Sequence, residues 1–212
     1  MKNLKYIWMA VILFPLLGMV SSCTKDETEE GEFDNWQQKN EAFLNQVISN
    51  PSYQKILTYT KDATNSSITN ADYIYVDVLE SGSGETALFT DSVFYTYRGR
   101  LIPSQSYANG YVFDQTFLGD FDWSTAGMQK ACVSWNTYTT SSGTRSDLFT
   151  EGFCTALQHM KKGDHWLVYI PYQLAYGETA SSSIPAYSTL IFEIAVADVW
   201  HPGETRPVFK SR

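Results

Sequence analysis

The sequence predicts a fold that combines β-strands with helices, and two patterns carry this prediction. Several short segments alternate apolar residues with others, as Trp166, Val168 and Ile170 do, which is typical of strands with one buried face. Between residues 33 and 58 apolar residues instead recur every three, four or seven positions, which is the period of a helix. The aromatic content of 15%, with fourteen Tyr, also favours strands and sites that bind apolar ligands.

Length and charge restrict the class of protein. A chain of 212 residues is long enough for one domain with its own core and some appendages. The net charge is −8 and no cluster of Lys and Arg is present. We therefore expect no nucleic-acid partner, because binding to a polyanion needs clustered positive charge.

The first residues resemble a bacterial lipoprotein signal. Lys2 and Lys5 precede an apolar run over residues 6–20, a pattern typical of a signal peptide and too short for a comfortable membrane span. Val20-Ser21-Ser22-Cys23 resembles a lipobox, which predicts a signal peptide over residues 1–22 and lipidation of Cys23. The alternative is an ordinary secretory signal in which Cys23 is incidental.

An acidic segment over residues 23–32 contains too little apolar surface to fold, so we expect a tether. Its Lys25-Asp26-Glu27 resembles the export signal of some Bacteroidetes outer-membrane lipoproteins. The expected location is the bacterial cell envelope, as an outer-membrane lipoprotein facing the periplasm or the exterior. The lipid at Cys23 would be its contact with the membrane.

Residues 33–70 are predicted to form a helical extension and a linker. The apolar stripe consists of Trp36, Phe43, Leu44, Val47 and Ile48. Asn50-Pro51 breaks the helix, and residues 52–58 are expected to be helical or irregular. Two roles remain open: a dimerisation arm or spacer, and a helix that packs on the domain.

The main domain is expected over residues 71–200, followed by a tail over residues 201–212. Strands are predicted over residues 73–79, 90–101, 130–135, 166–170 and 190–196, and a short helix over residues 152–160. The polar run over residues 136–147 is expected to be either a surface loop or a segment that shapes access to a site.

Cys132 and Cys154 would remain after lipidation of Cys23. An envelope compartment permits a disulfide between them, but two small buried thiols are equally compatible with the spacing. His159 follows Cys154 by five residues without a recognisable third partner, so a catalytic cysteine is not expected.

Several ordered motifs resemble the FKBP-type peptidyl-prolyl isomerase family. They are Tyr97-Arg98-Gly99, Phe113-Asp114, Ile170-Pro171, Leu174-Ala175-Tyr176-Gly177, Ile184-Pro185 and the segment over residues 188–193. This resemblance covers about residues 73–199 and implies an α+β fold, a twisted antiparallel sheet wrapped around a short helix. The long segment over residues 117–148 departs from the family pattern.

The resemblance also implies a site for a proline ring. Its catalytic residues would be Tyr97, Asp114 and Tyr176, and its substrate-binding residues Phe113, Phe149, Thr150, Phe153, Ile184 and Phe192. By the same resemblance, the Tyr176 hydroxyl and the Ile184 backbone N–H would contact substrate carbonyls. Phe153 stands where the family usually has Trp, which keeps apolar area but removes an indole N–H.

The activity implied is cis–trans isomerisation of X–Pro bonds in envelope or surface proteins, with macrolides as possible inhibitors. Rotation about a peptide bond requires no metal or cofactor, and none is expected. The alternative is an FKBP-like surface module that binds proline-containing segments with little turnover. Phe153 and the long segment before it favour that alternative.

Overall fold

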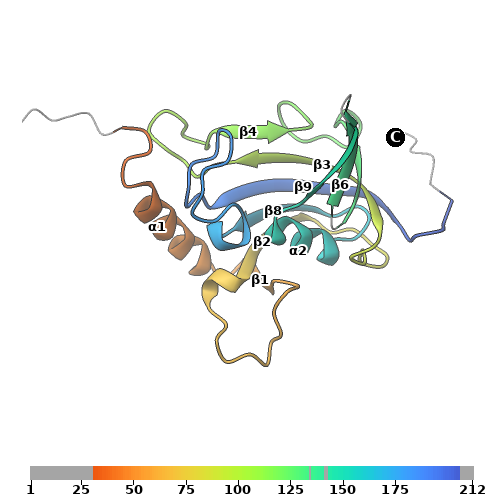
Figure 1. Ribbon diagram of the computed structural model, residues 1–212, viewed down its shortest axis with the longest axis horizontal. Helices are drawn as coiled ribbons and strands as arrows, with labels where there is room; N and C mark the ends of the chain where they lie inside the picture. Colours follow the sequence, from red (N-terminus) through yellow and green to blue (C-terminus); the bar gives the residue numbers. More distant parts are fainter. Residues whose placement is uncertain (1–30, 134, 141–142, 206–212) are drawn as a thin grey trace, which may run out of the picture. The chain divides into compact units, whose positions relative to one another are not determined.

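The computed structural model describes residues 31–133, 135–140 and 143–205, and its central feature is an antiparallel sheet. The seven strands have the order β1-β2-β8-β9-β3-β4, and β5 also pairs with β3 (Figure 1). Their bounds are β1 Gln54–Leu57, β2 Tyr73–Glu80, β3 Ser92–Arg100, β4 Val112–Gln115, β5 Gln129–Cys132, β8 His165–Ile170 and β9 Leu190–Trp200. This sheet confirms the predicted α+β class.

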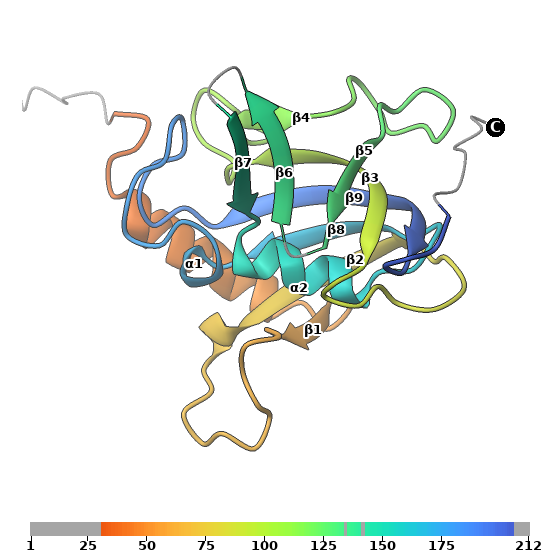
Figure 2. The same cartoon turned by 45° about the vertical axis from the view of Figure 1, so that its right-hand side comes forward.

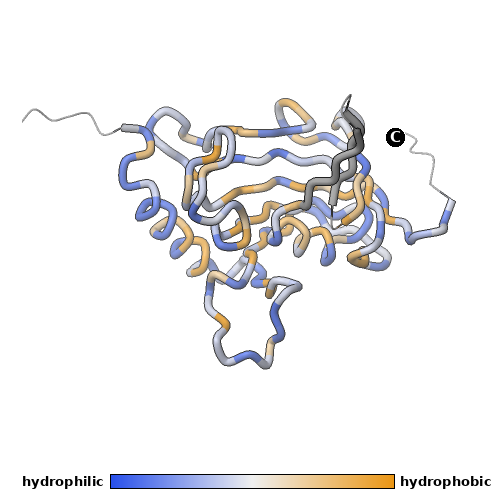
Figure 3. Tube along the Cα trace, in the orientation of Figure 1, coloured by the Kyte–Doolittle hydropathy of each residue, from blue (hydrophilic) through white to orange (hydrophobic). Residues whose placement is uncertain are grey.

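Helix α2 (Glu151–His159) packs against one face of the sheet, called here the inner face. The core there combines Ala156 and Leu157 of the helix with alternate strand residues such as Val76, Val168 and Ile194. Hydrophobic segments accordingly concentrate in α2 and the central strands (Figure 3). Gly152 permits the close approach, because a Cβ there would lie 2.3 Å from the Ile170 side chain.

Helix α1 (Trp36–Ile48) packs on the opposite face, called here the outer face. Its Val47 lies in a second cluster with Tyr75, Tyr169 and Ile191, which alternate with the inner-face residues along their strands. Of the two roles left open for the extension, the structure supports a helix that packs on its own domain.

The prediction for residues 52–58 was wrong in part. Gln54–Leu57 forms the edge strand β1, paired antiparallel with Leu57 opposite Tyr73. Its sequence Gln-Lys-Ile-Leu has two polar residues followed by two apolar ones, so no alternating pattern marks it as a strand. The strand forms because the edge of β2 offers unpaired backbone groups.

The long segment before α2 is not an open loop. Its backbone forms a hairpin of β6 (Trp135–Thr140) and β7 (Gly143–Leu148), a two-stranded sheet separate from the main one. The single strand expected over residues 130–135 is therefore divided between β5 and β6. The hairpin lies on the same side of the main sheet as α2 (Figure 2).

Cys132 and Cys154 are not joined by a disulfide in this structure. Each thiol donates a weak hydrogen bond to a backbone carbonyl, Cys132 to Phe89 and Cys154 to Phe149, both at 3.8 Å. Burial raises the pKa of Cys154 to about 12, so its thiolate is too scarce near neutral pH for a nucleophile.

The predicted signal peptide, the lipidation site at Cys23 and nearly all of the tether fall within residues 1–30, outside the described residues. Among the helices that the structure describes, none combines the length and apolarity needed to span a bilayer. Two short 3₁₀ helices complete the described elements, at Asn70–Asp72 and Tyr172–Leu174.

Candidate functional site

A cluster of aromatic rings covers the inner face where α2 meets β3 and β9. The Phe153 ring of α2 lies 5.0 Å from the Phe192 ring of β9 and 5.9 Å from the Tyr97 ring of β3, measured between centroids. The Tyr97 and Phe192 rings are 6.1 Å apart. Such separations allow favourable edge-to-face contacts between rings. Three residues predicted from separate segments therefore form one surface.

Phe113 of β4 joins this cluster because β3 has a glycine at the crossing point. The Phe113 ring lies 5.5 Å from the Phe192 ring, and Gly99 is paired with Phe192 across the strands. A Cβ on Gly99 would lie 2.5 Å from the Phe113 ring and 2.7 Å from the Phe192 ring. Only a residue without a side chain permits this arrangement of the two rings.

The segment before α2 supplies a further side of the cluster. The Phe149 ring lies 5.0 Å from the Phe153 ring and 5.9 Å from the ring of Tyr95, a fully buried neighbour in β3. Thr150 occupies the N-cap of α2 without a capping bond from its side chain. Its hydroxyl oxygen is buried and has no hydrogen-bond partner among the described residues.

Polar groups lie at one side of the rings. The Tyr97 hydroxyl donates a hydrogen bond of 2.5 Å to Asp114 Oδ2. Burial of the phenol, the hydrogen bond to Asp114 and the charge of that carboxylate raise the pKa of Tyr97 far above its ordinary value. Tyr97 is therefore a neutral hydroxyl at every physiological pH, held in place by an exposed carboxylate.

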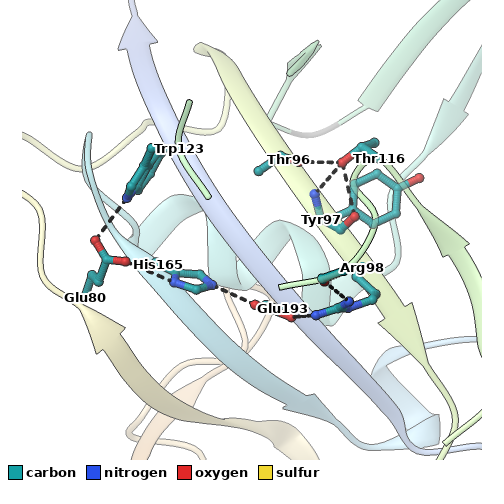
Figure 4. A network of polar contacts seen from close by, with 9 residues as sticks. Glu80, Thr96, Tyr97, Arg98, Thr116, Trp123, His165 and Glu193 are labelled. Carbon is teal, nitrogen blue, oxygen red and sulfur yellow. Dashed lines mark hydrogen bonds and ion pairs between the residues drawn. The ribbon is translucent and has the colours of Figure 1, made fainter. Parts of the chain in front are cut away.

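Thr116 keeps Tyr97 and β4 in register. Its Oγ1 accepts a hydrogen bond of 2.8 Å from the Tyr97 backbone N–H, and its own N–H donates to the Tyr97 carbonyl at 2.9 Å. Its hydroxyl is also 2.6 Å from the hydroxyl of Thr96 (Figure 4). Thr116 was not predicted to belong to the site. Its partner Tyr97 lies nineteen residues earlier in the chain, and no motif around Thr116 indicates this hydrogen bond.

Tyr176 lies in the loop that follows β8 and keeps 43% of its surface exposed. Partial burial and the negative charge of Asp114 raise the pKa of its hydroxyl. The charge of Asp114 thus acts on the hydroxyls of both Tyr97 and Tyr176, which were predicted from motifs far apart in the sequence.

Ile184 contributes its side chain to the buried core beside the rings. The side chain is buried in the same hydrophobic cluster as Phe153 and Phe192. Its backbone N–H donates to the Ser181 carbonyl at 2.8 Å within the loop. A contact of this N–H with a substrate carbonyl stays a prediction.

A match to a protein-family model decides the family. Residues 84–197, more than half of the chain, match the model of the C-terminal domain described as FKBP-type peptidyl-prolyl cis-trans isomerase. This chain belongs to that family. The matched residues include each predicted catalytic and substrate-binding residue, and they contain the ring cluster, Asp114 and Tyr176.

Two curated relatives are peptidyl-prolyl cis-trans isomerases by name. The FKBP-type peptidyl-prolyl cis-trans isomerase FkpA of Escherichia coli K12 is 28% identical over 131 residues, which is 62% of this chain and 39% of FkpA. The peptidyl-prolyl cis-trans isomerase Mip of Coxiella burnetii is 33% identical over 132 residues, which is 62% of this chain and 46% of Mip. The similarity thus spans less than half of each relative's length.

A solved structure shares the fold of this FKBP domain. The peptidyl-prolyl cis-trans isomerase from Pseudomonas syringae superposes with a TM-score of 0.54 at 22% identity, covering 79% of this chain and 95% of that chain. At this identity the comparison supports the fold, an antiparallel sheet against a short helix.

Proposed function

We propose that the protein is a peptidyl-prolyl cis-trans isomerase that assists the folding of proteins in the bacterial envelope. The observation that carries this proposal is the ring cluster of Tyr97, Phe113, Phe153 and Phe192 with hydroxyls at one side. A proline ring is a compact apolar group, and aromatic faces are well suited to hold it. Membership of the family supports the same activity.

The reaction is a rotation about a bond. Resonance gives the peptide bond a barrier of about 18–20 kcal/mol, and an X–Pro bond isomerises unaided over tens to hundreds of seconds. The twisted amide has less charge separation than the planar one, so an apolar surrounding disfavours the planar ground state. Hydrogen bonds that fit the twisted state better than the planar one then lower the barrier.

Each predicted residue has a defined part in this proposal. The rings of Phe113, Phe149, Phe153 and Phe192, with the Ile184 side chain, hold the proline. The exposed Tyr176 hydroxyl donates to a substrate carbonyl, and the buried Thr150 hydroxyl, without a partner among the described residues, is a second candidate donor. Asp114 and Tyr97 act together, because the carboxylate orients the phenol.

A protease-coupled assay with a proline-containing peptide tests the proposal. The full-length protein is expected to accelerate isomerisation, and Tyr176→Phe is expected to lower kcat/KM about fivefold, the worth of one neutral hydrogen bond of about 1 kcal/mol. Asp114→Ala is expected to lower kcat/KM more than Tyr176→Phe does, because loss of the carboxylate leaves the Tyr97 hydroxyl without its acceptor. No acceleration by the wild-type protein would refute the proposed activity.

The second candidate is a binding module with little turnover. The specific observation that favours it is the β6–β7 hairpin, which leads directly into Phe149 and α2 and so lies next to the proposed site. Phe153 in place of the family's usual Trp points the same way. Retained binding of a proline peptide by calorimetry, with no turnover, would select this alternative. Competition by a macrolide would test occupancy of the rings in either case.

For the membrane, we propose a lipid anchor at Cys23 that holds the domain at the outer membrane. The support is the sequence Val20-Ser21-Ser22-Cys23 followed by an acidic tether. Labelled fatty acid should be incorporated into the wild-type chain and lost in Cys23→Ala, which should also leave the membrane fraction. Protease treatment of intact cells then separates a periplasmic from a surface location.

A further inference from the structure

Helix α1 is joined to the loop that carries Ile184 by a chain of buried hydrogen bonds. Trp36 Nε1 donates to Ser188 Oγ at 2.8 Å, and Ser188 Oγ donates to the Pro185 carbonyl at 2.6 Å. Trp36 and Ser188 are exposed by only 6% and 3%. A hydrogen bond shielded from water in this way resists exchange with solvent and fixes both partners.

A second contact from the same helix reaches the adjacent residue. Asn40 Oδ1 accepts from the Thr189 backbone N–H at 2.7 Å, while Asn40 Nδ2 donates to the Trp36 carbonyl at 2.8 Å. Asn40 is completely buried. A buried amide with both ends satisfied has one permitted orientation, so Asn40 sets the distance between α1 and Thr189.

The loop needs such support because its backbone is strained. Tyr187 has a φ of 61° and Ser182 a φ of 52°, in the left-handed region that residues other than glycine adopt at a cost. Tyr187 immediately precedes Ser188, and Ser182 lies in the polar stretch of residues 181–183. A conformation of this kind persists when surrounding contacts determine it, and α1 supplies those contacts.

We propose that α1 is a positioning element of the functional site. Trp36 and Asn40 hold residues 184–189 so that the Ile184 side chain stays packed with Phe153 and Phe192. The effect on turnover rests on the proposed isomerase function, whereas the effect on the loop does not. The N-terminal extension therefore supports the site through the buried hydrogen bonds of Trp36 and Asn40 to Ser188 and Thr189.

Hydrogen exchange by mass spectrometry on the full-length protein in detergent tests the positioning directly. In Asn40→Ala, the backbone amides within residues 184–189, Pro185 excepted, are expected to exchange about tenfold faster or more, since local opening is no longer opposed. Trp36→Phe keeps a ring but removes the indole donor, and it should act in the same direction. Ser188→Ala should reproduce the effect, and Ser188→Thr, which keeps a hydroxyl, should restore protection.

The control is Val47→Ala, which weakens the packing of α1 on the outer face without touching the loop. Val47→Ala and Asn40→Ala are compared at temperatures equally far below their own Tm. Asn40→Ala is then expected to lower kcat about three- to tenfold with a smaller change in KM, because misplaced contacts in the site slow turnover. Val47→Ala should keep both kcat and exchange at residues 184–189 near wild type.

Three results separate the possibilities. Unchanged exchange at residues 184–189 in Asn40→Ala and Trp36→Phe would overturn the positioning role. Equal losses of kcat in Val47→Ala and Asn40→Ala would also overturn it, because lower stability alone would then explain the loss of kcat. If Asn40→Ala and Trp36→Phe exchange faster at residues 184–189 but the wild-type protein shows no turnover, the positioning of the loop is supported. The proposed isomerase function is then refuted.

Discussion

At the scale of the residue, the pair of Tyr97 and Asp114 shows how a carboxylate can serve a site without transferring a proton. Asp114 accepts the phenol hydrogen bond, and together with burial this raises the pKa of Tyr97. The phenol thus keeps its proton, and the carboxylate keeps the phenol oriented. This arrangement suits a reaction that requires fixed dipoles rather than acid–base exchange.

The activity is therefore expected to depend little on pH. Tyr97 and Tyr176 both have a raised pKa, so both stay neutral up to about pH 10, the ordinary value for tyrosine. We expect kcat/KM to be constant within about twofold from pH 6 to pH 9, since no proton is transferred. The measurement is an uncoupled assay by NMR exchange, which avoids the pH dependence of a protease. A tenfold step near pH 7 would contradict it.

Gly99 makes a second prediction at this scale. In Gly99→Ala the added Cβ would meet the Phe113 and Phe192 rings at 2.5 and 2.7 Å, so both rings must move. We expect a loss of about 1–3 kcal/mol in the free energy of unfolding, as for other overpacked sites, together with reduced peptide binding. Urea unfolding and calorimetry measure the two effects. Ser92→Ala, at the other end of β3, is the matched control and should change neither.

At the scale of the element, a row of charged residues ties four strands together on the outer face. Arg98 Nη2 of β3 bonds Glu193 Oε2 of β9 at 2.6 Å, and Glu193 Oε1 lies 3.0 Å from His165 Nε2 of β8. His165 Nδ1 is 3.4 Å from Glu80 of β2 (Figure 4). Because Arg98 neighbours Tyr97 in β3, this row holds the strand that presents the phenol on the other face.

This row predicts a loss of stability in acid. Burial alone would raise the pKa of Glu193, but hydrogen bonds and charges from His165 and Arg98 bring it below the ordinary value. Because the pKa of Glu193 is lower in the folded protein, its ionised form stabilises the fold at any pH above the pKa of Glu in the unfolded chain, about 4.3. This stabilisation is lost as the pH falls through the folded pKa. Glu193→Gln should be less stable at pH 7 yet lose less Tm between about pH 5 and pH 3.

Thermal unfolding of the two proteins across this range is the measurement. Arg98→Gln provides a companion variant, because it removes the partner at the shortest distance from the carboxylate while the carboxylate remains. It should reduce the acid dependence as well. An identical slope of Tm against pH in wild type and Glu193→Gln would contradict the assignment.

At the scale of the whole molecule, one sheet is covered on both faces by helices that have different roles. Helix α2 contributes Phe153 to the site, whereas α1 packs through Val47 on the outer face. The strands between them are shared, since Ile74 and Val76 lie in the inner cluster and Tyr75 in the outer one. Loss of either face exposes apolar surface of the same strands, which favours cooperative unfolding.

Val47→Ala tests this cooperativity. We expect one transition, with a free energy of unfolding lowered by about 2 kcal/mol, a common cost for truncating a buried aliphatic side chain. Far-UV circular dichroism and tryptophan fluorescence should follow the same curve, because Trp36 belongs to α1 and Trp166 to the core. Separate midpoints for the two signals would show that α1 unfolds on its own.

Much of the site could be predicted from short motifs. Alternation in residues 166–170 and 190–196 located β8 and β9. The motif Phe113-Asp114 predicted two residues that contact Phe192 and Tyr97 in the structure. These features are local: a strand with one buried face repeats every two residues. Each of these patterns therefore appears within a few residues of the chain.

Other features could not be predicted because they depend on partners far away in sequence. The edge strand β1 forms on β2, and the hairpin of β6 and β7 forms from a polar run with no apolar alternation. The hydrogen bond from the Ile184 N–H to the Ser181 carbonyl within the loop was likewise not predicted. Hydrogen-bond pairing of this kind is decided by geometry, which composition does not record.

The sequence by itself determined that apolar residues alternate along strands, that two segments are helical, and that the motifs of one family occur in order. Only the tertiary structure decided that Trp36 and Asn40 bond to Ser188 and Thr189, across about 150 residues of chain. Burial makes such bonds obligatory, because a buried polar group without a partner is costly. Local patterns specify which groups become buried, and packing specifies which partners they find.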